Sequence, residues 1–221
     1  MTVRSRPLFA RLYRRASEVM DEHGVAEHRR AAVAGLSGRV IEVGAGNGRM
    51  FAHYPATVTE VVAVEPERHL RAAAVDAATS VPVTVVEGLA EALPGGDGEF
   101  DAAVTALVLC SVPSQDAALA EIRRVLRPGG ELRFFEHVMA PSPGAMRRVQ
   151  RIVDATLWPP LMGGCHTGRD TAAAIARAGF TIEAISRFTF PATGPVGPAG
   201  PHILGRAVRS ALPEAHPVRT A

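Results

Sequence analysis

The sequence predicts a single α/β domain built around a largely parallel sheet. Short apolar runs alternate with amphipathic stretches along most of the chain, a glycine-rich turn directly follows the first apolar run, and carboxylates follow the second and third runs. Strands that alternate with helices at this spacing are typical of βαβ units and parallel sheets. A chain of 221 residues is long enough for one domain whose sheet is buried on both faces.

Two helices are predicted ahead of the first strand. From Pro7 onward, apolar side chains recur at steps of three and four residues with arginines between them, and the proline stands near the helix start. Gly24 interrupts this pattern, and a second helical stretch runs to about Ala34. The first of these helices is amphipathic, so we expect it to pack one face against the domain.

Short apolar runs then mark the strands. They lie at residues 39–43, 58–64, 81–86, 100–109 and 131–138, with a last strand at 202–208. Capping and stop signals mark the helices that follow these strands. One helix is predicted at residues 67–78, and a second begins after Ser114 and stops at Pro128-Gly129-Gly130. A third is predicted at residues 170–178, with Gly179 just beyond its end.

Two stretches interrupt the alternation of strands and helices. Residues 141–164 contain four prolines, and residues 191–201 alternate proline and glycine too densely for a helix or a strand. The predicted organisation is therefore a helical cap over residues 1–36, a main domain over 37–209 with a lid insert at 141–164, and a flexible tail over 210–221.

Composition and charge exclude several classes of protein. A formal net charge of +2 is too small to indicate nucleic acid as a partner. Cys110 and Cys165 lie far apart without the spacing of zinc ligands or of a disulfide framework, so we expect no metal. No apolar run reaches the roughly 18 residues that span a bilayer, and the arginine-rich start lacks the pattern of a secretory signal. These observations favour a cytoplasmic protein, and they leave open the oligomeric state and peripheral membrane contact by the first helix.

The first predicted binding feature is the turn after residues 39–43. Glu42-Val43-Gly44-Ala45-Gly46-Asn47-Gly48 places glycine at alternate positions, where the backbone must turn sharply or approach a ligand closely. This GxGxG spacing differs from the GxGxxG of dinucleotide-binding turns. A turn of this kind, preceded by an acid, suits a ligand that has an amino acid end and no phosphate, as S-adenosylmethionine has.

Carboxylates follow the next two strands. Glu65, followed by Pro66, lies about 20 residues after the first glycine, where a carboxylate can accept hydrogen bonds from both hydroxyls of a ribose. Leu89-Ala90-Glu91 lies in the loop after the third strand, where it can flank an adenine ring. Because the carboxyl ends of parallel strands meet at one edge of the sheet, these features together predict a site for S-adenosylmethionine.

From Phe9 to Arg209 the chain resembles the class I methyltransferase superfamily with a type 11 methyltransferase domain, and Leu126-Arg127-Pro128-Gly129-Gly130 is typical of its small-molecule members. The resemblance implies a Rossmann-like α/β fold with a seven-stranded, mostly parallel sheet of order 3-2-1-4-5-7-6, strand 7 antiparallel, and helices on both faces. It also implies that S-adenosylmethionine contacts Glu42, Gly44, Ala45, Gly46, Asn47, Gly48, Glu65, Pro66, Leu89, Ala90, Glu91, Ala106 and Leu107. Many members have aspartate where this chain has Leu89, so the adenine contact there would come from the backbone.

The second half of the chain is similar to a narrower family, whose animal members are thiol S-methyltransferases. The resemblance rests on Leu107-Val108-Leu109-Cys110-Ser111-Val112, residues 124–130, Glu136-His137-Val138, Gly164-Cys165, Arg169-Asp170 and Gly200-Pro201-His202-Ile203. It implies methyl transfer to a thiol sulfur. Two departures stand out: Ala45 replaces the cysteine usual in that family, and an arginine-rich helix stands where the animal members have an N-terminal membrane anchor.

Two histidines are the candidates for catalysis. His137 lies at the carboxyl end of the fifth predicted strand and His166 just before a helix, and histidine titrates in the range useful for a general base. The alternative is that His137 bonds to backbone and His166 caps a helix. A thiol has a pKa of about 8.5, so it is a few per cent ionised near pH 7 and needs little assistance from a base.

The acceptor pocket is expected between the first helix, the insert at 141–164 and the loop at 191–201. Its candidate lining residues, each of which is equally an ordinary core side chain, are Tyr13, Trp158, Met162 and Cys165. Such an apolar lining predicts a lipophilic small-molecule acceptor. O- or N-methylation of a natural product, and a non-catalytic protein that binds S-adenosylmethionine, are the alternatives to thiol methylation.

Overall fold

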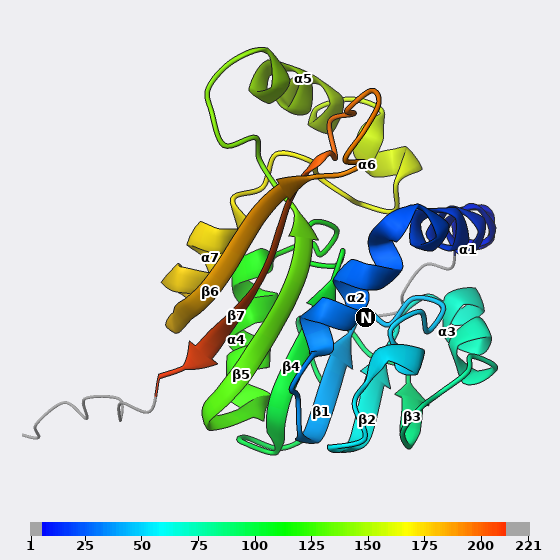
Figure 1. Ribbon diagram of the computed structural model, residues 1–221, viewed down its shortest axis with the longest axis vertical. Coiled ribbons are helices and arrows are strands. Elements are labelled where there is room, and N and C mark those ends of the chain that lie inside the picture. The colour runs from blue at the N-terminus through cyan, green and yellow to red at the C-terminus, as the bar shows by residue number, and fades with distance from the viewer. Residues whose placement is uncertain (1–5, 211–221) are drawn as a thin grey trace, which may run out of the picture.

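The computed structural model describes residues 6–210, which build one seven-stranded sheet with helices on both faces (Figure 1). The strand order is β3-β2-β1-β4-β5-β7-β6, and β7 runs antiparallel to both of its neighbours, β5 and β6, whereas the other neighbouring pairs are parallel. The predicted fold, strand order and strand direction are therefore confirmed. Residues 1–5 of the predicted cap and 211–221 of the predicted tail lie outside the described residues.

The predicted strands and helices appear in the predicted order, among further elements that the sequence pattern did not predict. The strands are β1 (Gly38–Val43), β2 (Val58–Val64), β3 (Val83–Val86), β4 (Phe100–Ala106), β5 (Leu126–His137), β6 (Phe180–Thr189) and β7 (Pro201–Arg209). The helices are α1 (Pro7–Met20), α2 (Ala26–Val33), α3 (Arg68–Val75), α4 (Gln115–Val125), α5 (Ala145–Asp154), α6 (Trp158–Leu161) and α7 (Thr171–Arg177). A π-helical segment, η1 (Asp21–Val25), joins α1 to α2, and a short 3-10 helix, η2 (Phe51–His53), precedes β2.

The central strands are buried on both faces because their sequences are apolar without alternation. On one face Ile41 packs in a cluster with Leu119 of α4, and on the other face Val40 packs in a second cluster with Val33 of α2. Fully burying one such side chain contributes roughly 1.5–3 kcal/mol. This packing fixes the positions at which the parallel strands end.

Side-chain caps start three helices close to the strand ends. Glu67 accepts hydrogen bonds from the backbone of His69 and Leu70 at the start of α3, at 2.7 and 2.8 Å. Ser114 accepts one from Ala117 at the start of α4, as predicted, and Asp170 caps α7. Such caps satisfy backbone donors that the first helical turn leaves unpaired, which contributes about 1 kcal/mol each.

β4 is shorter than predicted. It ends at Ala106 instead of residue 109, because Leu107 adopts a φ of 61°, a left-handed backbone that a strand cannot contain. The backbone N–H of Leu107 still donates to Phe135 of β5 at 2.7 Å. The chain therefore turns away directly after β4 and forms a loop over residues 107–113 at the edge of the sheet.

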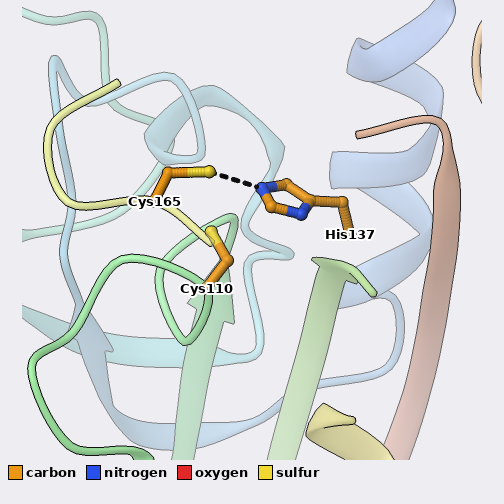
Figure 2. A group of neighbouring side chains, drawn as sticks. All are labelled: Cys110, His137 and Cys165. Carbon is orange, nitrogen blue, oxygen red and sulfur yellow. Dashed lines mark hydrogen bonds between the residues drawn. The ribbon is translucent and has the colours of Figure 1, made fainter. Parts of the chain in front are cut away.

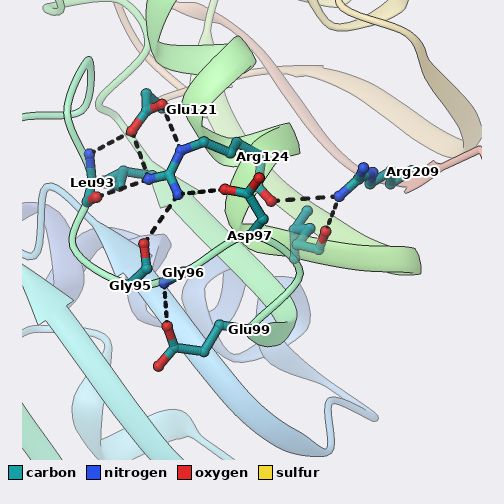
Figure 3. Close-up of polar contacts among 9 residues, drawn as sticks. Leu93, Gly95, Gly96, Asp97, Glu99, Glu121, Arg124 and Arg209 are labelled. Atoms are coloured by element: carbon teal, nitrogen blue, oxygen red, sulfur yellow. Dashed lines mark hydrogen bonds and ion pairs between the residues drawn. The ribbon is translucent and has the colours of Figure 1, made fainter. Parts of the chain in front are cut away.

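An arginine in α4 holds the loop that follows β3 (Figure 3). The guanidinium of Arg124 donates to the carbonyl oxygens of Leu93 and Gly95 at 3.0 Å each, and to Glu121 at 2.8 Å. This loop begins at the carboxyl end of β3, at the edge of the sheet where the sequence predicts a binding site. Arg124 holds the part of the loop that lies farther along the chain.

Three helices lie beyond the carboxyl ends of the parallel strands (Figure 1). α1 belongs to the predicted cap, and α5 and α6 lie within the predicted lid insert. Together they cover the edge of the sheet at which the sequence places its binding features. Within residues 6–210, no helix combines the length and the apolar character needed to cross a membrane.

Candidate active site

A cavity of about 480 Å³ lies at the carboxyl ends of β1, β2, β3 and β4, and its size is typical of pockets that enclose small molecules. The residues predicted for the site that line it are Tyr13, Gly44, Gly46, Glu65, Pro66, Leu89, Ala90, Glu91, Leu107 and His166. Those that lie outside its lining are Glu42, Ala45, Asn47, Gly48, Ala106, His137, Trp158, Met162 and Cys165. The structure therefore gathers most of the predicted cofactor residues, and few of the predicted acceptor residues, around one space.

The turn after β1 requires its glycines. Gly44, Gly46 and Gly48 have φ values of 70°, 56° and 77°, which side chains other than glycine rarely adopt. A Cβ on Gly44 would lie 2.6 Å from the side chain of Val108, so the loop after β4 approaches the bare backbone of the turn. Hydrogen bonds from Gly44 and Ala45 to the carbonyl of Val64 hold the turn against the end of β2.

Glu65 joins the turn to the end of β2. Its carboxylate accepts a hydrogen bond from the backbone of Gly46 and another from the backbone of Glu67, both at 2.8 Å. Burial raises the pKa of Glu65 to about 7, although these two donors act in the opposite direction. A carboxylate offers roughly four acceptor positions, so two remain for donors in the cavity. This is the donor pattern that the two hydroxyls of a ribose present.

Glu42 lies on the other side of the turn. Its side chain is buried and accepts a hydrogen bond from the hydroxyl of Tyr54 at 2.8 Å. Burial raises the pKa of Glu42 to about 8. The carboxyl group of Glu42 therefore bonds to Tyr54 and does not line the cavity, and the sequence alone does not reveal this because Tyr54 lies beyond the motif.

The loop after β3 forms the next wall of the cavity. Leu89, Ala90 and Glu91 line it, as does Gly88, and Leu89 pairs with Ala92 in an isolated β-bridge. The carboxylate of Glu91 also accepts a hydrogen bond from the backbone of Ser114 at 3.4 Å. This contact links the loop to the start of α4.

Helix α1 closes the cavity from above the strands. The ring of Tyr13 lies 3.2 Å from the position of a Cβ on Gly46, and the ring of Phe9 lies 2.5 Å from that of a Cβ on Gly163. Phe9, Tyr13 and Gly163 all line the cavity. The first helix and the end of the lid insert therefore meet over the same space, whereas no described residue of the loop at 191–201 contributes to its lining.

Two residues that sequence reasoning missed hold the loop over residues 107–113. Glu136, fully buried in β5, accepts hydrogen bonds from the backbone of Val108 at 3.2 Å and of Leu109 at 3.1 Å. Arg169 lines the cavity and donates to the carbonyls of Leu109 and Val112 at 2.8 and 2.7 Å. A glutamate within the apolar run of β5 was the signal that could have indicated the first of these roles.

The two candidate histidines occupy different environments. His166 lines the cavity, and its Nδ1 lies 2.9 Å from the carbonyl oxygen of Gly164 and 3.3 Å from the guanidinium of Arg169. His137 is buried outside the lining, and its Nε2 lies 3.1 Å from the sulfur of Cys165 (Figure 2). Trp158 donates to the same sulfur at 3.2 Å. Met162, by contrast, is 44% exposed.

Comparisons with known proteins agree on the kind of protein. Residues 41–134 match the family described as a methyltransferase domain. Thiol S-methyltransferase TMT1B from Homo sapiens is 35% identical over 185 residues, which cover 80% of this chain and 74% of that protein. Thiol S-methyltransferase TMT1A from Homo sapiens is 33% identical over 183 residues, which cover 80% and 73%.

Solved structures show the same fold at lower identity. The structure of a geranyl diphosphate methyltransferase in complex with S-adenosylmethionine superimposes with a TM-score of 0.67. The two chains are 15% identical, and the superposition covers 85% of each. At this level of identity the likeness concerns the arrangement of strands and helices alone.

Proposed function

We propose that this chain, which belongs to the methyltransferases that use S-adenosylmethionine and to the family that includes the thiol S-methyltransferases, methylates the sulfur of small lipophilic thiols. The observation that carries this proposal is the extent of the similarity. The alignment with TMT1B spans 185 residues, whereas the match to the methyltransferase domain is confined to residues 41–134. The similarity therefore includes segments that close the acceptor side of the cavity.

S-adenosylmethionine supplies a methyl group on a positively charged sulfur when it is bound. We assign its ribose hydroxyls to the free acceptor positions of Glu65, and its methionine part to the backbone of the turn at Gly44 and Gly46. Leu89 and Glu91 border the adenine in this assignment. The assignment fits the observation that a side chain at Gly44 or Gly46 would fill the space beside the turn.

On the acceptor side, the residues align the thiol and exclude water. Displacement at a methyl group depends on alignment of the reacting atoms more than on proton transfer. Residues 1–36 act in this proposal as the cap and residues 141–164 as the lid, because Tyr13 and Gly163 reach the cavity from them. His166 receives the proton of the thiol, whose ordinary pKa of about 8.5 means that little assistance from a base is needed.

The test is turnover on acceptors of matched shape. The purified chain is incubated with S-adenosylmethionine and benzyl thiol, benzyl alcohol or benzylamine, with phenol as a fourth acceptor, and S-adenosylhomocysteine is measured. We expect turnover of the thiol to exceed that of the alcohol and the amine by at least about 100-fold, because the thiol alone ionises appreciably without a strong base. Turnover restricted to phenol or the amine would refute the thiol proposal and leave the methyltransferase assignment intact.

A further inference from the structure

We propose that Cys110, Cys165 and His137 bind one zinc ion, and that the fourth position on this zinc takes the sulfur of the acceptor. The part that concerns the acceptor rests on the proposed function above, whereas the metal site does not. The three side chains converge from the loop after β4, the end of β5 and the loop before α7 (Figure 2). Each is buried, with no more than 7% of its surface exposed.

The size of this cluster matches zinc. The two sulfur atoms and one ring nitrogen all lie within 4.8 Å of one another, and Cys165 Sγ lies 3.1 Å from His137 Nε2. Zinc bonds of about 2.3 Å to sulfur and 2.0–2.1 Å to nitrogen place tetrahedral ligands roughly 3.6–3.8 Å apart. Side-chain shifts of about 1 Å are therefore enough to close the three ligands around an ion.

The donor set favours zinc over magnesium or calcium. Thiolate and imidazole are ligands of soft and borderline metals, whereas magnesium and calcium prefer oxygen. Three protein ligands, instead of the four of a structural site, are typical of zinc that keeps one position for a substrate. Both cysteines are free, so neither sulfur is held in a disulfide.

Neighbouring groups support a bound metal. Trp158 Nε1 donates to Cys165 Sγ at 3.2 Å, and the hydroxyl of Ser111 lies 3.3 Å from Cys110 Sγ. Outer contacts of this kind orient the ligands of metal sites. The buried Nδ1 of His137 has no hydrogen-bond partner within residues 6–210, so Nε2, which faces Cys165, is the ring nitrogen that makes the polar contact.

The cluster lies directly behind the wall of the cavity. Ser111, Gly164 and His166 line the cavity, and each is a chain neighbour of Cys110 or Cys165. When an acceptor thiol takes the fourth position, its sulfur–hydrogen bond breaks, the proton passes to His166 and a sulfur–zinc bond forms, with no change in oxidation state. A thiol that coordinates zinc is deprotonated outright. The zinc therefore holds the acceptor as a thiolate beside the cofactor site.

Cobalt(II) is the probe that tests the site. The full chain, reduced and freed of metal, is titrated with cobalt(II) and then with zinc, and its absorption is recorded. We expect one cobalt(II) per chain, with thiolate-to-cobalt charge-transfer bands that zinc removes. Because the chain has two cysteines in all, these bands can arise only from Cys110 and Cys165.

Variants locate the ligands. We expect Cys165→Ser and His137→Gln to weaken cobalt(II) binding at least 100-fold. His166→Gln, which changes a histidine beside Cys165 but outside the cluster, is the matched control and keeps the wild-type affinity for cobalt(II). If a ligand variant fails to fold, the wild-type chain still decides the question, because thiolate-to-cobalt bands in it require Cys110 or Cys165 as a ligand.

Several results would overturn the inference. Absence of thiolate bands in the reduced chain, formation of a Cys110–Cys165 disulfide in place of metal binding, or full cobalt(II) affinity in Cys165→Ser each contradicts the metal site. Unchanged bands after addition of benzyl thiol contradict the role in acceptor binding. Failure of the thiol proposal is distinguishable from these results. If the chain methylates other acceptors instead of thiols, the cobalt(II) titration still shows whether Cys110, Cys165 and His137 bind metal.

Discussion

The two sides of the cavity are built in different ways. On the cofactor side, the turn at Gly44 and Gly46, the carboxylate of Glu65 and the loop at Leu89 each directly follow one strand. On the acceptor side, α1 and the lid insert meet over the loop at 107–113. Short sequence motifs therefore predict the side of a site that is made from strand ends. They do not predict a side that is made from segments distant from one another in the chain.

The two sides also differ in charge. Glu65 and Glu42 stand on the cofactor side, and burial raises their pKa values to about 7 and about 8. Apolar groups and an imidazole line the acceptor side, through Phe9, Val112 and His166. A ligand that carries positive charge suits the first environment and a lipophilic thiol the second. Variants that act on one side alone test whether this division is real.

The largest effect is expected for Gly46→Val. The substitution places a branched side chain at a φ of 56°, facing the ring of Tyr13, so we expect affinity for S-adenosylmethionine to fall at least 100-fold by calorimetry. Gly35→Ala is the control, since Gly35 has a φ of 74° with nothing within 4 Å of its added Cβ. Equal losses in the two variants would show that backbone strain, and not the site, is responsible.

Glu65→Gln should weaken cofactor binding by about 10–100-fold, because the amide removes one acceptor and sets a donor against backbone N–H groups. The wild-type affinity should rise with pH through about 7, since ionised Glu65 is the better acceptor for hydroxyl groups, and this dependence should vanish in the variant. Glu87→Gln is the matched control, because the side chain of Glu87 is 66% exposed and pairs with Arg71 at the surface. A variant that binds as tightly as wild type removes Glu65 from the ribose site.

His166→Gln probes the acceptor side. We expect cofactor affinity to stay within about twofold, and the rate of methyl transfer to fall by about tenfold for thiols of high pKa and less for acidic thiols. The measurement is kcat across a series of thiols of graded pKa. A uniform loss across the series would mean that His166 orients the wall of the cavity and does not take the proton.

The smallest effect, on stability alone, is expected for Glu42→Gln. Because burial raises the pKa of Glu42 to about 8, its contribution to stability is complete below its ordinary pKa and is lost as the pH rises through about 8. The amide keeps an acceptor for Tyr54 without a charge. We expect the variant to melt roughly 5 °C above wild type at pH 9 and together with it at pH 4. Equal melting temperatures of the variant and the wild type at both pH values would contradict the raised pKa of Glu42.

Local patterns predicted most of the fold. The run at 58–64 became β2 without change, and the Ser114 cap starts α4 as expected, because both signals act within a few residues. β6 was not assigned from the sequence pattern, since its residues alternate only weakly and it is an edge strand that is largely exposed. The end of β4 was misplaced because the left-handed backbone of Leu107 follows from its tertiary setting.

The sequence by itself determined the fold and the gathering of Gly44, Glu65 and Leu89 around one cavity, because glycines and carboxylates that follow parallel strands meet wherever the sheet forms. Only the tertiary structure decided the acceptor side. It set Glu136 beneath the loop at 107–113, placed His166 at the cavity, and turned His137 toward Cys165 instead. These contacts join positions far apart in the chain, and nothing in their local sequence encodes a distance between side chains.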